Sequence, residues 1–182
     1  MLFKAFVAFS LVLAPTSAVS LIQYLGPDCT GTKRICANIR PNLCCQCNWD
    51  GYINPFVSGR CQGCTSTDSQ NLWRSEGKGF CESLAFTRNG GDCQGEQHRK
   101  LFGHSWLQNR KMSASEDAQC TGTVAPDLIT RDDVTFFRIG EGVPLEDEMA
   151  LEEWLTREVT VEEMPEHLLK YRTGFNATEA AD

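Results

Sequence analysis

The sequence predicts a small disulfide-rich, mainly β domain, followed by an acidic C-terminal segment with helical character. Three observations lead to this prediction. The 182-residue chain has ten cysteines, and all of them lie between Cys29 and Cys120. Short apolar runs alternate with glycines and prolines, which leaves little room for long helices in this part of the chain. After Gly140 there is no cysteine, and apolar residues recur at helical spacing.

The first predicted element is a signal peptide over residues 1–18. One positive charge at Lys4 precedes a largely apolar run, and small residues lead up to Ala18. The run is too short to span a bilayer, and no later run reaches the required length. We therefore expect a secreted, extracellular protein without a membrane span. Entry into host cells after secretion stays open.

The cysteines predict a disulfide framework, because secreted chains are made in an oxidising compartment. An even count allows five bridges, whose connectivity the sequence does not give. Adjacent Cys44 and Cys45 cannot easily bridge one another, so each should reach a different partner. A structural zinc site from the five cysteines in 44–64 is the less favoured alternative. The predicted bridge residues are Cys29, Cys36, Cys44, Cys45, Cys47, Cys61, Cys64, Cys81, Cys93 and Cys120.

Four Cys-x-Gly triplets, which begin at Cys29, Cys61, Cys93 and Cys120, punctuate the β domain predicted over residues 19–140. A glycine at this offset can supply the positive φ of a tight turn beside a half-cystine. Both chance and an internal repeat stay open as the origin of the triplets.

Strands are predicted where apolar or aromatic runs are flanked by turn residues, at residues 22–24, 52–57, 84–86 and 133–139. Tyr24 begins an aromatic-x4-Cys-x-Gly pattern after the first run. This pattern resembles the hairpin signature of βγ-crystallin-type domains, with cysteine in place of the second aromatic. The resemblance implies a Greek-key arrangement as one form of the β domain. Calcium sites of that family use paired Asn/Asp followed by Ser/Thr-Ser, and the nearest match, at residues 70–75, has Arg74 at a ligand position, so we predict no calcium site.

The C-terminal extension over residues 141–182 is predicted to be partly helical. Apolar residues such as Met149 and Trp154 recur at helical spacing, and Pro165 interrupts the pattern. We expect this stripe to pack on the β domain, with a partner-binding helix as the alternative. Because the extension has no cysteine, we also expect it to be separable by truncation after Gly140.

Charge divides the chain in the same way. Residues 19–140 have 13 Lys/Arg against 12 Asp/Glu, whereas residues 141–182 have 3 against 12. A strongly acidic extension argues against nucleic acid and anionic membranes as partners, since both are themselves negative.

Candidate catalytic residues are few, and we assign none. His98 and His104, together with Glu82 or Glu96, are the residues that a ribonuclease-like acid/base pair would use. No nucleophile elbow or zinc-protease motif is present in the sequence. We expect no cofactor and no metal.

Two candidate binding surfaces are the aromatic set of Trp49, Tyr52 and Phe56 and the stripe around Trp154, with buried packing as the alternative for both. Asn176 begins an N-glycosylation sequon, which would make the protein a glycoprotein.

Three dibasic pairs could be cut by a processing protease, with solvated charge as the favoured interpretation. They are Lys33-Arg34, Arg99-Lys100 and Arg110-Lys111.

A signal peptide, then the pattern that starts at Tyr24, then Cys36 and adjacent Cys44 and Cys45, resembles small secreted cysteine-rich proteins of filamentous fungi. Many of these are candidate effectors, so the resemblance implies a role in virulence. It implies a monomer that binds a host protein or an extracellular polymer. A small ribonuclease-like hydrolase or toxin and an extracellular cell-wall structural protein are the alternatives.

Overall fold

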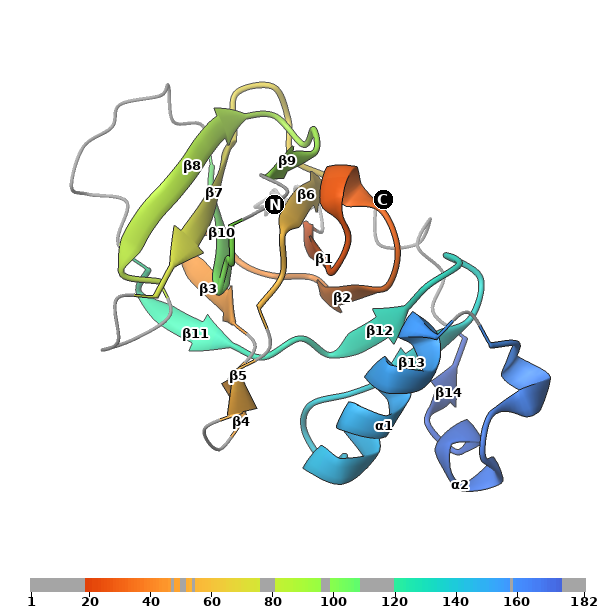
Figure 1. Cartoon of the computed structure of the whole chain (residues 1–182). Coiled ribbons are helices and arrows are strands. Elements are labelled where there is room, and N and C mark those ends of the chain that lie inside the picture. Colours follow the sequence, from red (N-terminus) through yellow and green to blue (C-terminus); the bar gives the residue numbers. More distant parts are fainter. Residues whose placement is uncertain are drawn as a thin grey trace, which may run out of the picture.

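The structure, a computed structural model, is mainly β and has a short helix near the C-terminus, which confirms the predicted fold class (Figure 1). The predicted signal peptide, Cys47, His98 and Asn176 lie outside the described residues. None of the helices described here is long and apolar enough to cross a membrane. The structure describes residues 19–46, 48, 49, 52, 53, 55–75, 81–95, 99–108, 120–157 and 159–174, with only the backbone at 48, 49, 52 and 53.

Seven strands of the described chain form the larger sheet, in the order β14-β13-β12-β2-β1-β6-β9. All neighbouring pairs in this sheet are antiparallel. Predicted strand 133–139 is a strand only in its second half, because the preceding residues form the turn of a hairpin. The strands are β1 Ser20–Tyr24, β2 Lys33–Cys36, β6 Ser58–Gln62, β9 Gln94–Gly95, β12 Leu128–Thr130, β13 Phe136–Arg138 and β14 Arg172–Thr173.

Five strands form the second sheet, in the order β11-β3-β10-β7-β8, where β11 runs parallel to β3. Predicted strand 52–57 is mostly not a strand: it holds the short β5, and Phe56 makes a single bridge to Leu101. The strands are β3 Leu43–Gln46, β7 Ser69–Arg74, β8 Ser83–Asn89, β10 Gly103–Leu107 and β11 Gly122–Val124, and β4 Asn48–Trp49 pairs with β5 Tyr52–Ile53.

The helical extension consists of α1 (Leu145–Thr156), a 3-10 turn (Val161–Glu163) and α2 (Glu166–Leu169). Pro144 and Pro165 immediately precede the two α-helices, where a missing N–H costs least. The predicted helical stripe is confirmed at the buried Leu151 and Leu155, but not at Met149. Met149 is 41% exposed, whereas the neighbouring Glu148 is buried.

One row of residues crosses the larger sheet and shows how that sheet is covered. Gly59, Gln23, Arg34, Ile129 and Phe137 are cross-strand neighbours on β6, β1, β2, β12 and β13. Residues in direct register point to the same face of a sheet, so this row defines one face.

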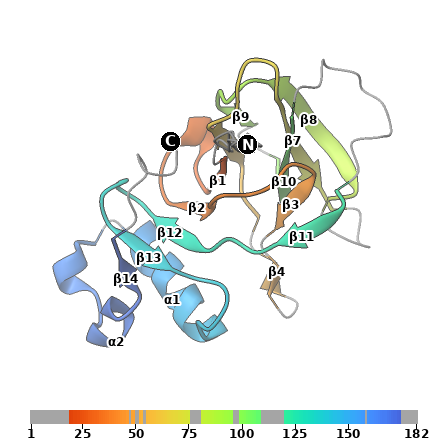
Figure 2. The same cartoon turned by 180° about the vertical axis from the view of Figure 1, so that it is seen from behind.

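Two different structures cover that face. At the Gly59 end lies the five-stranded sheet: a Cβ on Gly59 would meet the His104 ring at 3.1 Å, and Gln23 Nε2 donates to the Cys45 carbonyl at 2.9 Å. At the Ile129 and Phe137 end lies the helical extension. Figures 1 and 2 show the two covers at opposite ends of the molecule. The extension contributes Leu151, Leu155, Met164 and Leu168 to this shared core.

Of these two covers, only the five-stranded sheet is bonded to the larger sheet by a disulfide. Cys36 on β2 bonds to Cys45 on β3 and so joins the two sheets. Adjacent Cys44 and Cys45 reach different partners, as predicted, and four of the five cysteines of the zinc alternative are in disulfides. The bridges among the described cysteines are Cys29–Cys93, Cys36–Cys45, Cys44–Cys81 and Cys61–Cys64.

The Cys-x-Gly triplets do not share one structure. Gly31 has φ 77° in the connection between β1 and β2, where a left-handed backbone favours glycine. Gly122 instead is the first residue of strand β11. The first and third triplets are nevertheless joined, since Cys29 bonds to Cys93.

Candidate functional site

The histidines do not form an acid/base pair in the described chain. His104 is fully buried between the sheets, and its Nε2 lies 3.3 Å from Gln70 Oε1. Burial lowers the pKa of His104 to about 3, with the Ile22 backbone as the smaller, opposing influence. A neutral ring without access to solvent cannot exchange a proton with a substrate. His98, its predicted partner, lies outside the described residues.

The aromatic set is not a surface at Phe56. This side chain is fully buried in a cluster with Leu72 and Leu101, so packing is its role. The side chains of Trp49 and Tyr52 lie outside the described residues. Trp154, the centre of the second predicted surface, is partly buried against the core that the extension shares with the larger sheet.

The basic pair Lys33-Arg34 is not solvated charge, because both side chains are buried in β2. Lys33 forms an ion pair with Asp133. Arg34 has no exposed surface, and its Nε donates to Glu152 Oε2 of α1 at 2.9 Å. A protease cannot reach this pair in the folded protein. Arg99-Lys100 is exposed, and Arg110-Lys111 lies outside the described residues.

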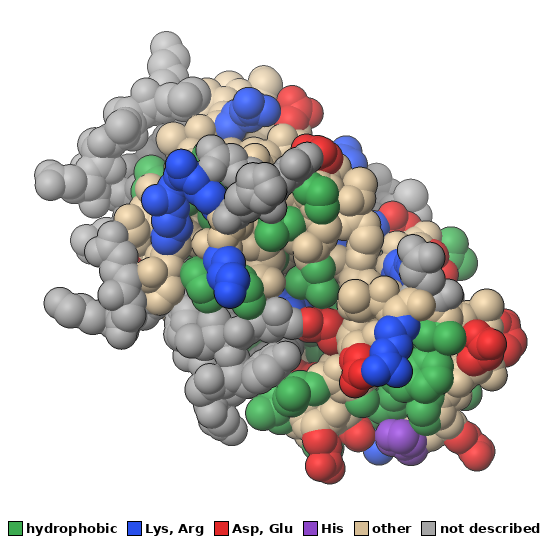
Figure 3. Space-filling model, viewed as in Figure 1, with side chains coloured by type: hydrophobic (Ala, Val, Ile, Leu, Met, Phe, Trp, Pro, Cys, Tyr) green, Lys and Arg blue, Asp and Glu red, His purple; other side chains and the backbone are tan. Residues whose placement is uncertain are grey.

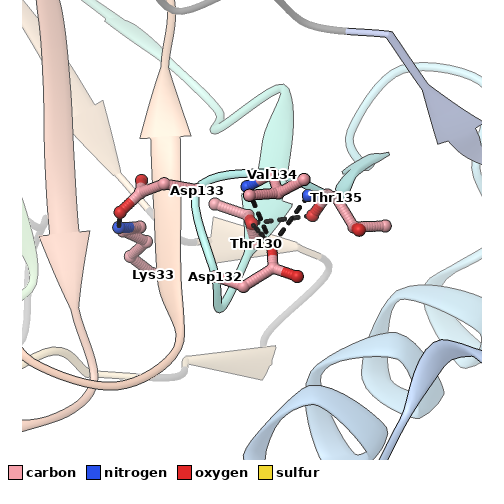
Figure 4. A network of polar contacts seen from close by, with 6 residues as sticks. All are labelled: Lys33, Thr130, Asp132, Asp133, Val134 and Thr135. Atoms are coloured by element: carbon pink, nitrogen blue, oxygen red, sulfur yellow. Dashed lines mark hydrogen bonds and ion pairs between the residues drawn. The ribbon is translucent and has the colours of Figure 1, made fainter.

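Two aspartates at the β12–β13 hairpin have structural partners (Figure 4). Asp132 Oδ1 accepts hydrogen bonds from the backbone N–H groups of Val134 and Thr135, at 2.9 and 2.7 Å. Burial alone would raise the pKa of Asp132, but these N–H groups, together with its own N–H and the Thr130 hydroxyl, outweigh it and hold the pKa below its ordinary value. With Asp133 paired to Lys33, the network closes the hairpin and leaves no carboxylate pair for catalysis there.

Among the described carboxyl groups of the extension, Glu148 has the most strongly shifted pKa. It is buried beneath α1, and its Oε1 accepts a hydrogen bond from the Gly140 N–H at 2.5 Å. Burial raises the pKa of Glu148 to about 7, although the Gly140 N–H and the charge of Arg34 oppose the shift. Sequence reasoning missed this residue, since a glutamate in an acidic helix is ordinarily solvated.

An open groove of about 610 Å³ runs along the outer side of α1. Carboxylates of Glu146, Glu152 and Glu153 line it beside Met149, the exposed apolar residue of the helix. Figure 3 shows that acidic side chains gather over α1 and α2, while basic side chains lie mostly over the other end of the molecule. The lining of the groove is thus mainly acidic, with Met149 as an exposed apolar contact. Its lining is completed by Ala150, Thr156 and Arg157.

A cluster of three cysteines lies beside strand β3 of the five-stranded sheet. The sulfur atoms of Cys44, Cys81 and Cys120 are all within 4.8 Å of one another. Cys44 and Cys81 are bonded, and Cys120 has no bonded partner among the described cysteines. Burial raises the pKa of the Cys120 thiol, and a hydrogen bond with the Ser105 side chain opposes that shift. The spacing of the cysteines in the sequence does not predict this cluster, because its members come from distant parts of the chain.

No protein-family model, curated protein or solved structure matches this chain. The fold and its sites define a disulfide-bonded, cysteine-rich β protein with a docked acidic helical extension. Multiple disulfides are consistent with an extracellular protein. The resemblances to βγ-crystallin-type hairpins and to fungal effectors stay predictions.

Proposed function

We propose that this is a secreted, effector-like protein that acts by binding a positively charged host protein or extracellular polymer. The observation that carries the proposal is the acidic groove along α1. One side of the helix is held on the larger sheet by buried Leu151 and Leu155. The other side is left to present Glu146 and Glu153 to solvent. A surface held rigidly in this way loses little conformational entropy on binding.

The chemistry of the groove favours a cationic side chain with an apolar stem. Arg157 forms an ion pair with Glu153, and Glu152 is paired with Arg34 from the sheet side, which leaves the exposed carboxylate of Glu146 in excess along the groove. Exposed Met149 offers apolar contact to the stem of a lysine or arginine, whose charged end would meet the carboxylates. The net charge of the extension, 3 Lys/Arg against 12 Asp/Glu, would also speed the approach of a cationic partner.

Binding is favoured over the two alternatives on different grounds. The hydrolase alternative loses His104, whose ring is buried and neutral, and it would have to rest on His98. A cell-wall structural protein would bind glycans as well. Glycan pull-down separates that alternative, because its binding should not depend on salt or on the charge of the glycan.

The test uses two charge-matched double variants of the full mature protein. Glu146→Gln with Glu153→Gln neutralises the groove, whereas Glu141→Gln with Glu162→Gln removes the same charge at exposed positions outside its lining. The probes are host extracellular fluid and partially deacetylated chitin, a cationic polymer. We expect capture that falls at least tenfold in the groove variant, weakens with salt, and persists in the control.

Equal capture by both variants would exclude the groove as the binding surface. Salt-insensitive binding to neutral glycans would favour the structural protein. Hydrolysis of RNA, glycans or peptides at an ordinary enzymatic rate, lost on His98→Ala, would overturn the binding function itself.

A further inference from the structure

Three sulfur atoms that belong to distant segments meet beside strand β3. Cys44 lies on β3 and has no exposed surface, and its bonded partner Cys81 precedes β8, with 6.6 Å between the two Cα atoms. Cys120 precedes β11, and its thiol lies within 4.8 Å of both bonded sulfurs. A thiol this close to a disulfide is positioned for thiol–disulfide exchange.

We propose that Cys44 has two alternative partners, and that Cys120 displaces Cys81 from it in the folded protein. The Cys120 thiolate attacks the sulfur of Cys44, a new bond forms between these two sulfurs, and the Cys44–Cys81 bond breaks. Cys81 leaves as a thiolate and takes up the proton that Cys120 lost. One disulfide replaces another, so the step needs neither an oxidant nor a reductant.

The backbone holds the attacking residue in place. The N–H of Thr121 donates to the Asn42 carbonyl at 2.8 Å, and Thr123 of β11 lies in register with Cys44 in the parallel β3–β11 pair. On the other side of β3, Ser105 of β10 is the cross-strand neighbour of Cys44. These pairings do not depend on which sulfur Cys44 is bonded to, so both bridges fit the same sheet.

The exchange has a consequence at the edge of the sheet. Cys81 is partly exposed and lies just before β8, one of the two edge strands of the sheet. Its bond to Cys44 ties the start of this strand to the interior, and its release leaves a solvent-accessible thiol there. That thiol can attack a disulfide of low molecular weight, such as oxidised glutathione, or an exposed disulfide of a partner; a mixed disulfide forms and the other half of the attacked disulfide leaves as a thiol.

The fraction of Cys120 that is present as thiolate sets the rate of the exchange. Burial keeps this thiol protonated at neutral and acidic pH, and the thiolate is the attacking species. The interconversion is therefore slow in acid and speeds up by about tenfold per pH unit toward alkaline pH.

The exchange is tested with the full mature protein, its disulfides intact. Samples held at pH 4.5 and pH 8.5 are quenched in acid, unfolded, and alkylated with N-ethylmaleimide at pH 6. They are then digested with trypsin. Cys81 and Cys120 fall on different tryptic peptides, because Lys78 and Arg88 bound the first and Lys111 and Arg131 the second. We expect label on both peptides in complementary fractions, which reach their final ratio far faster at pH 8.5.

Two variants sharpen the result. Cys120→Ser removes the attacking thiol, so the Cys81 peptide should carry no label at either pH. Cys81→Ser should leave Cys120 masked in a bridge to Cys44. Label confined to Cys120 in the wild-type protein at both pH values would overturn the proposal. So would a Cys120 that is already bridged to Cys47, with Cys44–Cys81 intact.

Discussion

The two covers of the larger sheet bury the same face by different means. The five-stranded sheet is bonded to it through Cys36–Cys45 and contributes buried polar side chains such as His104. The helical extension has no disulfide. It is held by an apolar cluster and by the buried contact of Arg34 with Glu152, and Tyr171 Oη donates to Asp147 within it at 2.6 Å.

This difference separates a permanent cover from a reversible one. The Cys36–Cys45 bond contains no ionisable group, so changes of protonation and salt do not weaken it directly, and it is not one of the bonds in the proposed exchange. The helical cover depends on ionisable groups, Arg34, Glu148 and Glu152, at its contact with the sheet. We expect the extension to detach first when the protein is stressed, and each prediction below changes one part of this comparison.

The largest effect should come from truncation after Gly140. The sequence favours a separable extension, but the contacts favour the opposite result. The extension buries four large apolar side chains against the sheet, which is on the order of 6 kcal/mol of hydrophobic burial. It also adds β14 to the edge of β13. We expect poor secretion or a melting temperature lowered by more than ten degrees, measured by yield and thermal unfolding with thiol counting.

Truncation after Gly174 is the control, because it keeps β14 and both helices. A protein cut after Gly140 that melts with the full-length protein and has the same masked thiols would show that the extension is indeed separable.

The second prediction concerns the buried Arg34–Glu152 contact. Arg34→Met or Glu152→Met alone leaves one buried charge without its partner, which costs about 3–5 kcal/mol. The Arg34 variant should be the worse of the two, because Arg34 makes further contacts. The double variant should recover at least half of the summed loss. Urea unfolding of the four proteins, with disulfides intact, gives the coupling energy.

Arg157 and Glu153 provide the matched pair on the same helix. Both are exposed, so the same double-mutant cycle should yield a coupling of at most about 0.5 kcal/mol. A coupling at Arg34 as small as this would show that the extension is held by apolar contacts alone.

The sequence predicts the apolar part of this structure better than the polar part. The β class, the separate partners of Cys44 and Cys45, and the helix around Trp154 follow from local patterns. Strands β7 and β10 do not, because they bury polar residues such as Gln70 and His104 where an alternating pattern would place apolar ones.

The residues that hold the extension could not be found for a different reason. Arg34 looks like half of a surface dibasic pair, and its partner Glu152 lies 118 residues further along the chain. Glu148 is buried in place of the neighbouring Met149, because its carboxylate accepts the Gly140 N–H at the start of the extension. Neither contact can be predicted from the local spacing of residues, so both are found only in the folded structure. The cysteine cluster at Cys120 is hidden in the same way.

The third prediction is that the two covers respond to pH in opposite directions. Glu148 has a pKa raised to about 7 from an ordinary 4.5, so the folded state favours its protonated form. Its contribution to stability is complete below pH 4.5 and is lost as pH rises through 7. His104 has a pKa lowered to about 3 from 6.5, so its contribution is present above pH 6.5 and is lost as pH falls toward 3.

Between pH 4.5 and 6.5 the two contributions oppose each other, and the free energy of unfolding should change little there. Glu148→Gln removes one of them, so the stability of this variant should rise with pH over that range. At pH 8 the variant should exceed the wild-type protein by up to about 3 kcal/mol, whereas at pH 4 the two should agree. Urea unfolding from pH 4 to 8 measures this, with the exposed Glu162→Gln as control. A difference between Glu148→Gln and wild type that is the same at every pH would mean that Glu148 does not titrate on folding. The helical cover would then be no more sensitive to pH than the disulfide-bonded one.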